Sequence, residues 1–188
     1  ASWVVEVMSR SIFSFEDPIR FIVGTIGLPG EREFFLQVKD ASNIRSFSLE
    51  KSQASALGER CSEILREIGA NRRAEVVDLN PLETPVESEF PIGVMSLLWN
   101  AEDSRFFLEA QSALGVDGNQ LAEELVQGDD DDAPSLLRVK FTIEMAAAFS
   151  RRTADVVAAG RQPCMFCGGP VDLSGHLCPR ANGYRRRE

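Results

Sequence analysis

The sequence predicts an α+β protein: two degenerate β-β-β-α units that form an antiparallel sheet or half-barrel with helices packed on it, plus a small C-terminal zinc module. Short bursts of Phe, Ile and Val separated by turn residues predict the strands. Two longer stretches with apolar residues at helical spacing predict the helices. The zinc module is predicted because three of the four cysteines and the single histidine lie close together near the end of the chain.

The first unit is expected over residues 20–69. Its strands are predicted at 20–27, 32–40 and 44–50, as an antiparallel meander. Pro29 and Gly30 suit the two central positions of a type II turn between the first two strands. A helix is expected over 50–69 with Gly69 as its C-terminal cap, because apolar residues recur there at Leu57, Cys61, Ile64, Leu65 and Ile68.

The second unit, residues 90–160, repeats this order. Its strands are predicted at 90–100, 104–113 and 135–142, and its helix at 143–159. The string FFL occurs at 34–36 and again at 106–108. At a constant offset, the apolar positions of the first helix correspond to Phe149, Thr153, Val156, Val157 and Gly160. These correspondences indicate an internal duplication, and the chance recurrence of short apolar strings is the alternative.

The remaining segment of the body, residues 115–134, is interpreted as an acidic insertion on the surface. Its four consecutive aspartates at 129–132 are typical of a solvated loop, and they lack the alternating spacing that a calcium loop requires. The tail, residues 161–188, carries five arginines against two acidic residues, a charge of +3. Since the whole chain carries −9, residues 1–160 carry −12. Such a body repels phosphate backbones, so only the tail is expected to contact nucleic acid.

Composition predicts a globular protein, since 188 residues with 44% hydrophobic and 26% charged residues are enough for one core. No apolar run reaches the roughly 18–20 residues that a membrane span requires. The start of the chain lacks the basic region and cleavage site of a secretion signal. We therefore expect a cytoplasmic protein that does not contact a membrane.

The tail contains a candidate metal site formed by Cys164, Cys167, His176 and Cys178. The first two form a C-x2-C pair followed by two glycines, and the last two form H-x-C. Three thiolates and one imidazole are a known tetrahedral zinc set. A redox pair and a disulfide are the alternatives, but the C-x2-C pair lies outside a strand-to-helix junction and cytosolic proteins rarely carry disulfides. Only residues 160–163 separate the site from the preceding helix, so the tail is expected to dock on the body.

A four-ligand site leaves no coordination position for water or substrate, so the zinc is expected to be structural. With His176 committed to the metal, the chain has no histidine for a catalytic triad or a general base. Phosphate-binding glycine motifs are also absent from the sequence, and Cys61 fits an inert core position. No catalytic residue is predicted, and a non-catalytic protein is favoured over an enzyme.

The opening RFIVGTIGLPGEREFFLQ, the stretch PLETPVESEF and the tail AAGRQPCMFCGGPVDLSGHLCPRANGYRR together carry a family resemblance. The chain resembles a family of actinobacterial proteins with a domain of unknown function, and the resemblance covers nearly all of residues 8–187. It implies an actinobacterial, cytoplasmic protein and no assigned reaction. The positions that match the family's tail motif are Cys164, Cys167, His176, Cys178, Arg180, Asn182, Gly183, Tyr184 and Arg185.

Three functions are compatible with these features. The first is a zinc-stabilised adaptor or regulatory protein with a protein partner. The second is binding of nucleic acid or a ribonucleoprotein through the zinc module and the contacts of Arg180, Tyr184, Arg185, Arg186 and Arg187. The third is an enzyme that acts on a phosphorylated small molecule in the groove between the units, with Arg180 or Arg20 as anion ligands.

Overall fold

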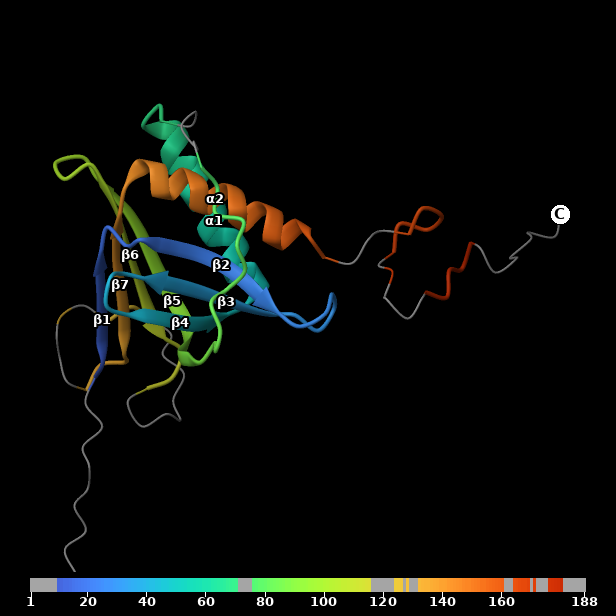
Figure 1. The fold of residues 1–188 in the computed structure, drawn as a ribbon, viewed down its shortest axis with the longest axis horizontal. Coiled ribbons are helices and arrows are strands. Elements are labelled where there is room, and N and C mark those ends of the chain that lie inside the picture. The colour runs from blue at the N-terminus through green and yellow to red at the C-terminus, as the bar shows by residue number, and fades with distance from the viewer. Residues whose placement is uncertain are drawn as a thin grey trace, which may run out of the picture.

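The computed structural model describes residues 10–70, 76–115, 124–126, 128, 132–160, 164–169, 171 and 176–180. Two helices lie side by side on the same side of a curved sheet (Figure 1). The strands and helices, in chain order, are β1 (Ile12–Glu16), β2 (Arg20–Ile26), β3 (Glu33–Lys39), β4 (Ile44–Leu49), α1 (Lys51–Glu67), β5 (Ser88–Asn100), β6 (Arg105–Ser112), β7 (Leu136–Phe141) and α2 (Ile143–Ala158). This architecture confirms the α+β class.

The strands form one mixed sheet in the order β1-β7-β6-β5-β4-β3-β2. Strands β2–β4 and β5–β7 each form the antiparallel meander that the sequence predicts. The sheet as a whole is not purely antiparallel, because β4 pairs with β5 in parallel and β1 pairs with β7 in parallel. The strand β1 was not predicted, although its Phe13 and Phe15 alternate with polar residues.

The sheet curls so that its two edge strands come together at one corner. β1 and β2 lie at opposite ends of the strand order, yet only residues 17–19 connect them. The ring of Phe13 in β1 lies 5.6 Å from that of Phe47 in β4, and the ring of Phe21 in β2 lies 4.8 Å from that of Phe141 in β7. Contacts between strands so far apart in the order require a concave sheet, as in the predicted half-barrel.

Both helices begin at capped N-termini and turn an apolar face toward this concave side. The N–H of Glu50 donates to Oε1 of Gln53 (2.7 Å) at the start of α1, and Thr142 Oγ1 accepts from the N–H of Met145 (3.1 Å) at the start of α2. The ring of Phe149 in α2 stacks on that of Phe21 at 4.4 Å. The two helices therefore close the open side of the half-barrel over one aromatic core.

The two units share more than their element order. In β3 and β4, Phe34 pairs with Leu49, and at the corresponding positions of β6 and β7, Phe106 pairs with Phe141. The helices correspond at one offset: the buried positions Ala54, Leu57, Gly58 and Cys61 of α1 match the buried positions Ala146, Phe149, Ser150 and Thr153 of α2. These matches support the internal repeat, which stays a prediction.

The predicted turn between β2 and β3 has the expected geometry. The N–H of Glu31 donates to the carbonyl of Leu28 at 2.9 Å, and Gly30 has a positive φ of 95°. A positive φ at the third residue is the requirement of a type II turn, which is why Gly30 follows Pro29.

The connection between α1 and β5 returns across the outer face of β2 and β3. Leu82 packs there against Ile22 and Phe35, and the buried Gln37 side chain accepts from the N–H of Glu83 and donates to its carbonyl. The Arg20 guanidinium binds Asp78 and donates to the carbonyls of Asn80 and Pro81. This segment is therefore part of the folded body.

The described parts of the predicted insertion are tied to the body as well. Gln111 in β6 donates to the carbonyl of Glu124 (2.7 Å) and accepts from the N–H of Val126 (2.8 Å). Arg10 donates to the carbonyls of Gly128 and Pro134. Residues 129–131, which hold most of the aspartate run, lie outside the described residues. Neither of the helices in the described part of the chain has the length and hydropathy needed to cross a membrane.

Candidate metal centre

The first half of the candidate site is a tight turn over residues 164–169. The carbonyl of Cys164 accepts from the N–H of Gly168 at 2.8 Å, and the N–H of Cys164 donates to the carbonyl of Gly169 at 2.7 Å. Gly168 has a φ of +73°, a backbone angle that disfavours any residue with a Cβ. The turn brings the sulfurs of Cys164 and Cys167 to the same side, as the sequence predicts.

Backbone N–H groups point at both sulfurs of this turn. The N–H of Phe166 lies 3.5 Å from Sγ of Cys164, and the N–H of Gly169 lies 3.4 Å from Sγ of Cys167. Such donors stabilise a thiolate, because they place partial positive charge against the sulfur. The pattern Cys-x2-Cys-Gly-Gly therefore supplies both the ligands and the donors that favour their charged form.

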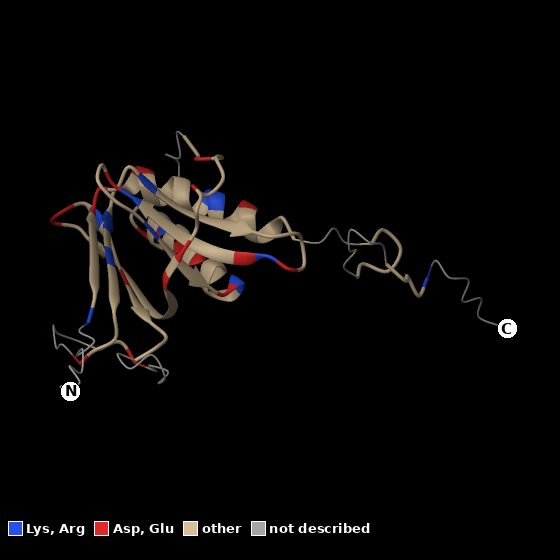
Figure 2. Ribbon diagram, turned by 60° about the horizontal axis from the view of Figure 1, so that its bottom comes forward, with Lys and Arg blue, Asp and Glu red and all other residues tan. Residues whose placement is uncertain are grey.

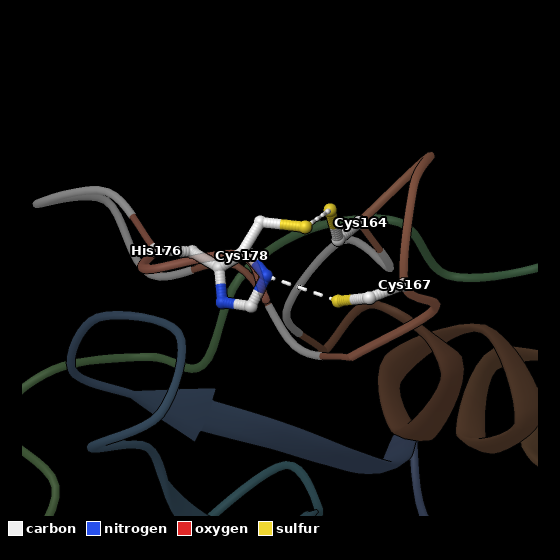
Figure 3. Close-up of side chains that lie close together, drawn as sticks. All are labelled: Cys164, Cys167, His176 and Cys178. Carbon is white, nitrogen blue, oxygen red and sulfur yellow. Dashed lines mark hydrogen bonds between the residues drawn. The ribbon is translucent and has the colours of Figure 1, made fainter. Parts of the chain in front are cut away.

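The second half of the site places His176 and Cys178 opposite this turn (Figure 3). Sγ of Cys178 lies 3.7 Å from Sγ of Cys164, and Nε2 of His176 lies 3.1 Å from Sγ of Cys167. All four ligand atoms lie within 4.8 Å of one another. The structure thus brings together the four residues that the spacing of the sequence singles out.

The two thiols of the turn differ in acidity. Hydrogen bonds from the backbone of Cys167 and Phe166 lower the pKa of Cys164 to about 6. The Gly169 N–H lowers the pKa of Cys167, but burial and the neighbouring sulfurs of Cys178 and Cys164 outweigh it and leave that pKa raised. Three sulfurs this close cannot all carry charge unless a cation lies among them.

The geometry fits a small tetrahedral cation. In a tetrahedron the distance between two ligands is about 1.6 times the metal–ligand bond, so Zn–S bonds of about 2.3 Å place two sulfurs about 3.8 Å apart. The Cys164–Cys178 separation of 3.7 Å matches this value. The separation of 3.1 Å between Cys167 and His176 is shorter than such an edge, so a metal would move these two ligands slightly apart. The cluster can hold a metal ion with a full set of protein ligands.

Of the predicted anion contacts in the tail, the structure describes Arg180. Its Nη1 donates to the carbonyl of Phe166 at 3.2 Å, so this exposed side chain ties the end of the module to the cysteine turn. Sequence reasoning missed this contact, because nothing in the spacing of the motif indicates it. Tyr184, Arg185, Arg186 and Arg187 lie outside the described residues.

Three apolar side chains of the module are exposed. Met165 and Leu177 are each 87% exposed and Phe166 is 57% exposed. Beyond the C-terminal end of α2, the described residues of the module lie apart from the sheet and the helices in Figure 1. Docking of the tail on the body stays a prediction.

Two other residues that the sequence analysis names, Cys61 and Arg20, lie in the body and not in the metal cluster. Cys61 is fully buried in α1, and burial raises the pKa of its thiol to about 12, in keeping with an inert core residue. Arg20, suggested by the sequence as an anion ligand, donates from Nε and Nη2 to Asp78 and from Nη2 to the carbonyls of Asn80 and Pro81. Its role as an anion ligand stays a prediction.

Comparisons with known proteins place the chain in a family. No curated protein and no solved structure matched the sequence. A family described as "Protein of unknown function (DUF3090)" matches residues 13–178. This match begins in β1 and ends at the last residue of the metal cluster, so it spans the body and all four candidate ligands. The chain therefore belongs to the DUF3090 family.

Proposed function

We propose that Cys164, Cys167, His176 and Cys178 bind one structural zinc ion and that the protein is a non-catalytic, zinc-stabilised adaptor or regulatory protein. The observation that carries the proposal is the convergence of three sulfurs and one imidazole nitrogen within 4.8 Å. Soft thiolates together with imidazole favour zinc over magnesium or calcium, which prefer oxygen ligands.

A structural role follows from the number of ligands. Four protein ligands complete a tetrahedral zinc site, whereas catalytic zinc sites keep one position for water or substrate. The single histidine of the chain is one of the four, so it cannot also act as a general base. None of the four cysteines forms a disulfide. Thiols that must stay reduced suit the cytoplasm, which is the compartment we propose.

The adaptor role rests on the surface of the module. Exposed Met165, Phe166 and Leu177 lie on or beside the ligand loops, and apolar side chains in one small module favour contact with another surface. A zinc ion would hold these side chains in a fixed arrangement, which lowers the entropy cost of binding a partner protein.

Zinc analysis of the purified chain tests the metal site. We expect about one equivalent of zinc per chain, its loss in Cys167→Ser, and its retention in Cys61→Ala, which removes the one cysteine outside the cluster. A metal-free wild-type chain whose tail thiols all react with a thiol reagent would contradict the site.

Affinity purification from the native cell tests the adaptor role. Wild-type protein and the Cys167→Ser variant serve as matched baits, and we expect a partner protein that the variant loses. Equal recovery of all proteins with both baits would show that the zinc module does not mediate binding.

The charge of the tail favours one alternative, the binding of nucleic acid. The tail carries +3 beside a body of −12. For this function, a gel shift that weakens with salt and disappears when the chain is cut after Ala181 is the expected result.

A further inference from the structure

An open cavity of about 1220 Å³ lies where the two units meet. Its lining comes from the start of β3, the end of β4 and the start of α1 in the first unit, and from the start of β5 and the end of α2 in the second. It is separate from the metal cluster, none of whose ligands lines it. The proposed zinc-dependent function does not account for this cavity.

Two cationic side chains converge at the Gly160 end of the cavity. A Cβ placed on Gly160 would lie 3.6 Å from Nζ of Lys51 and 3.9 Å from Nη2 of Arg32. Both cations therefore border the same small volume. Gly160 leaves that volume free of any side chain of its own.

Two contacts hold the Arg32 side chain in an orientation suited to binding an anion. Its Nη1 donates to the carbonyl of Val156 at 3.2 Å, and its guanidinium lies 5.2 Å from the centre of the Phe34 ring. Because one edge of the guanidinium is used in this way, Nη2 is left to face the cavity. A guanidinium that is already oriented loses little entropy when it binds an anion.

Among the residues that the structure describes, no carboxylate pairs with the two cations at this point. Glu33 and Glu50 also line the cavity, yet neither forms an ion pair with Arg32 or Lys51 in the described part of the chain. The N–H groups of Lys51 and Ser52, in the first turn of α1, have no intrahelical acceptor and add partial positive charge there. An anion placed beside Gly160 would meet two full charges.

The rest of the cavity is suited to an organic group. Phe34, Leu49, Ile92 and Val157 line it. The combination of an apolar wall and a few convergent polar groups is typical of small-molecule sites. Because residues 1–160 carry −12, the body repels a long polyanion. A small molecule with a single phosphate carries far less charge than a polyanion, so the body repels it less.

We propose that this cavity binds a phosphorylated small molecule, with the phosphate held between Arg32 and Lys51 and the organic part against the apolar wall. The site goes beyond the zinc-dependent function and does not depend on it. By binding such a ligand, a regulatory protein could respond to metabolism. The proposed binding involves no chemical step.

Titration with inorganic phosphate and phenyl phosphate tests the site, with sodium chloride at matched ionic strength as the blank. We expect saturable binding by calorimetry and a rise in Tm of about 3 °C at ten times Kd. Phenyl phosphate should bind about tenfold more tightly than phosphate, because its ring buries apolar surface. Equal affinities for the two probes would contradict an organic ligand.

Three variants locate the binding. Lys51→Gln and Arg32→Gln should each weaken phenyl phosphate at least about tenfold. Arg60→Gln removes a cation from the exposed face of α1 outside the cavity and should leave the affinity unchanged. If Arg32→Gln fails to fold, Lys51→Gln still tests the site, because the Lys51 side chain is exposed. Undiminished binding of phenyl phosphate by Lys51→Gln would show that the phosphate does not bind at this site. Tighter binding of single-stranded RNA than of phenyl phosphate would show that the ligand is not a small molecule.

Discussion

A single backbone angle at Gly168 decides the shape of the cysteine turn. Its φ of +73° turns the next residue back over the turn, so that the carbonyl of Gly169 accepts from the N–H of Cys164 and the N–H of Gly169 approaches Sγ of Cys167. Residues with a Cβ adopt this region at a cost of roughly 1–2 kcal/mol. The metal site therefore depends on a residue that ligates nothing.

Replacement of Gly168 by Ala is expected to weaken zinc binding by about tenfold, because the strain falls on the folded, metal-binding form of the turn. Competition against a chelator of known affinity measures the change. Gly69→Ala is the matched control, since Gly69 also has a φ of +73° and, like Gly168, has no atom within 4 Å of an added Cβ. Equal zinc affinities for all three proteins would show that the turn is not required.

The ligands could be predicted from sequence because they are local. Cys164 and Cys178 are 14 positions apart, and the spacing of the motif alone brings them together. Arg32 and Lys51 could not be predicted as a pair with Gly160, because more than a hundred positions separate them from it. Their approach depends on the packing of α2 against the first unit, which periodicity does not reveal.

At the scale of the elements, the connection after α1 is held to the sheet by a network around Asp78. Its carboxylate binds Arg20 and lies 3.7 Å from Nη1 of Arg152, and the side chains of both arginines are at most 10% exposed. Without this carboxylate, two buried guanidinium groups would lack their counter-charge. The network therefore links α2, β2 and the connection.

The Asp78→Asn variant is expected to be less stable than the wild type by about 2 kcal/mol at pH 7. The hydrogen bond from Arg20 lowers the pKa of Asp78 below 3.8, although burial opposes it. A lowered folded-state pKa means that the stabilisation is complete above 3.8 and is lost as the pH falls through the folded-state value. Urea unfolding at several pH values should show the difference shrinking in acid.

Glu83→Gln is the control for this prediction. The Glu83 carboxylate pairs with Lys39 on the surface, where both side chains are well exposed, so its removal should cost less than about 1 kcal/mol. A difference between Asp78→Asn and the wild type that persists unchanged at low pH would mean that the carboxylate charge is not what holds the connection.

Most elements could be predicted because their patterns are strong and local. The expected helix over 50–69 is α1, and the expected strand over 44–50 is β4. The parallel pairing of β4 with β5 could not be predicted, because it depends on the path of the long connection between α1 and β5. The local sequence determines the register only of strand pairs that are joined by hairpin turns.

At the scale of the whole molecule, the core lies entirely within the body. The main buried cluster draws its residues from β1 to α2 and includes none from the metal cluster. A body of this size buries enough surface to fold without the tail. The stability of the body and the order of the tail should therefore be separable.

Removal of zinc by a chelator, or the Cys167→Ser change, is expected to leave the Tm of the body within about 2 °C of the wild type while the tail becomes sensitive to protease. Scanning calorimetry and limited proteolysis measure the two effects in the same samples. Unfolding of the whole chain in Cys167→Ser would show that the module contributes to the core.

The strand β1 lies parallel to β7 in the same relation that β5 has to β4. It thus covers the backbone edge of β7 as β5 covers that of β4. A bare β7 edge would offer its unpaired N–H and C=O groups to a strand of another molecule. The five residues of β1 therefore pair the backbone of β7 within the same chain and leave a short strand at this end of the sheet, and short edge strands limit edge-to-edge pairing between molecules.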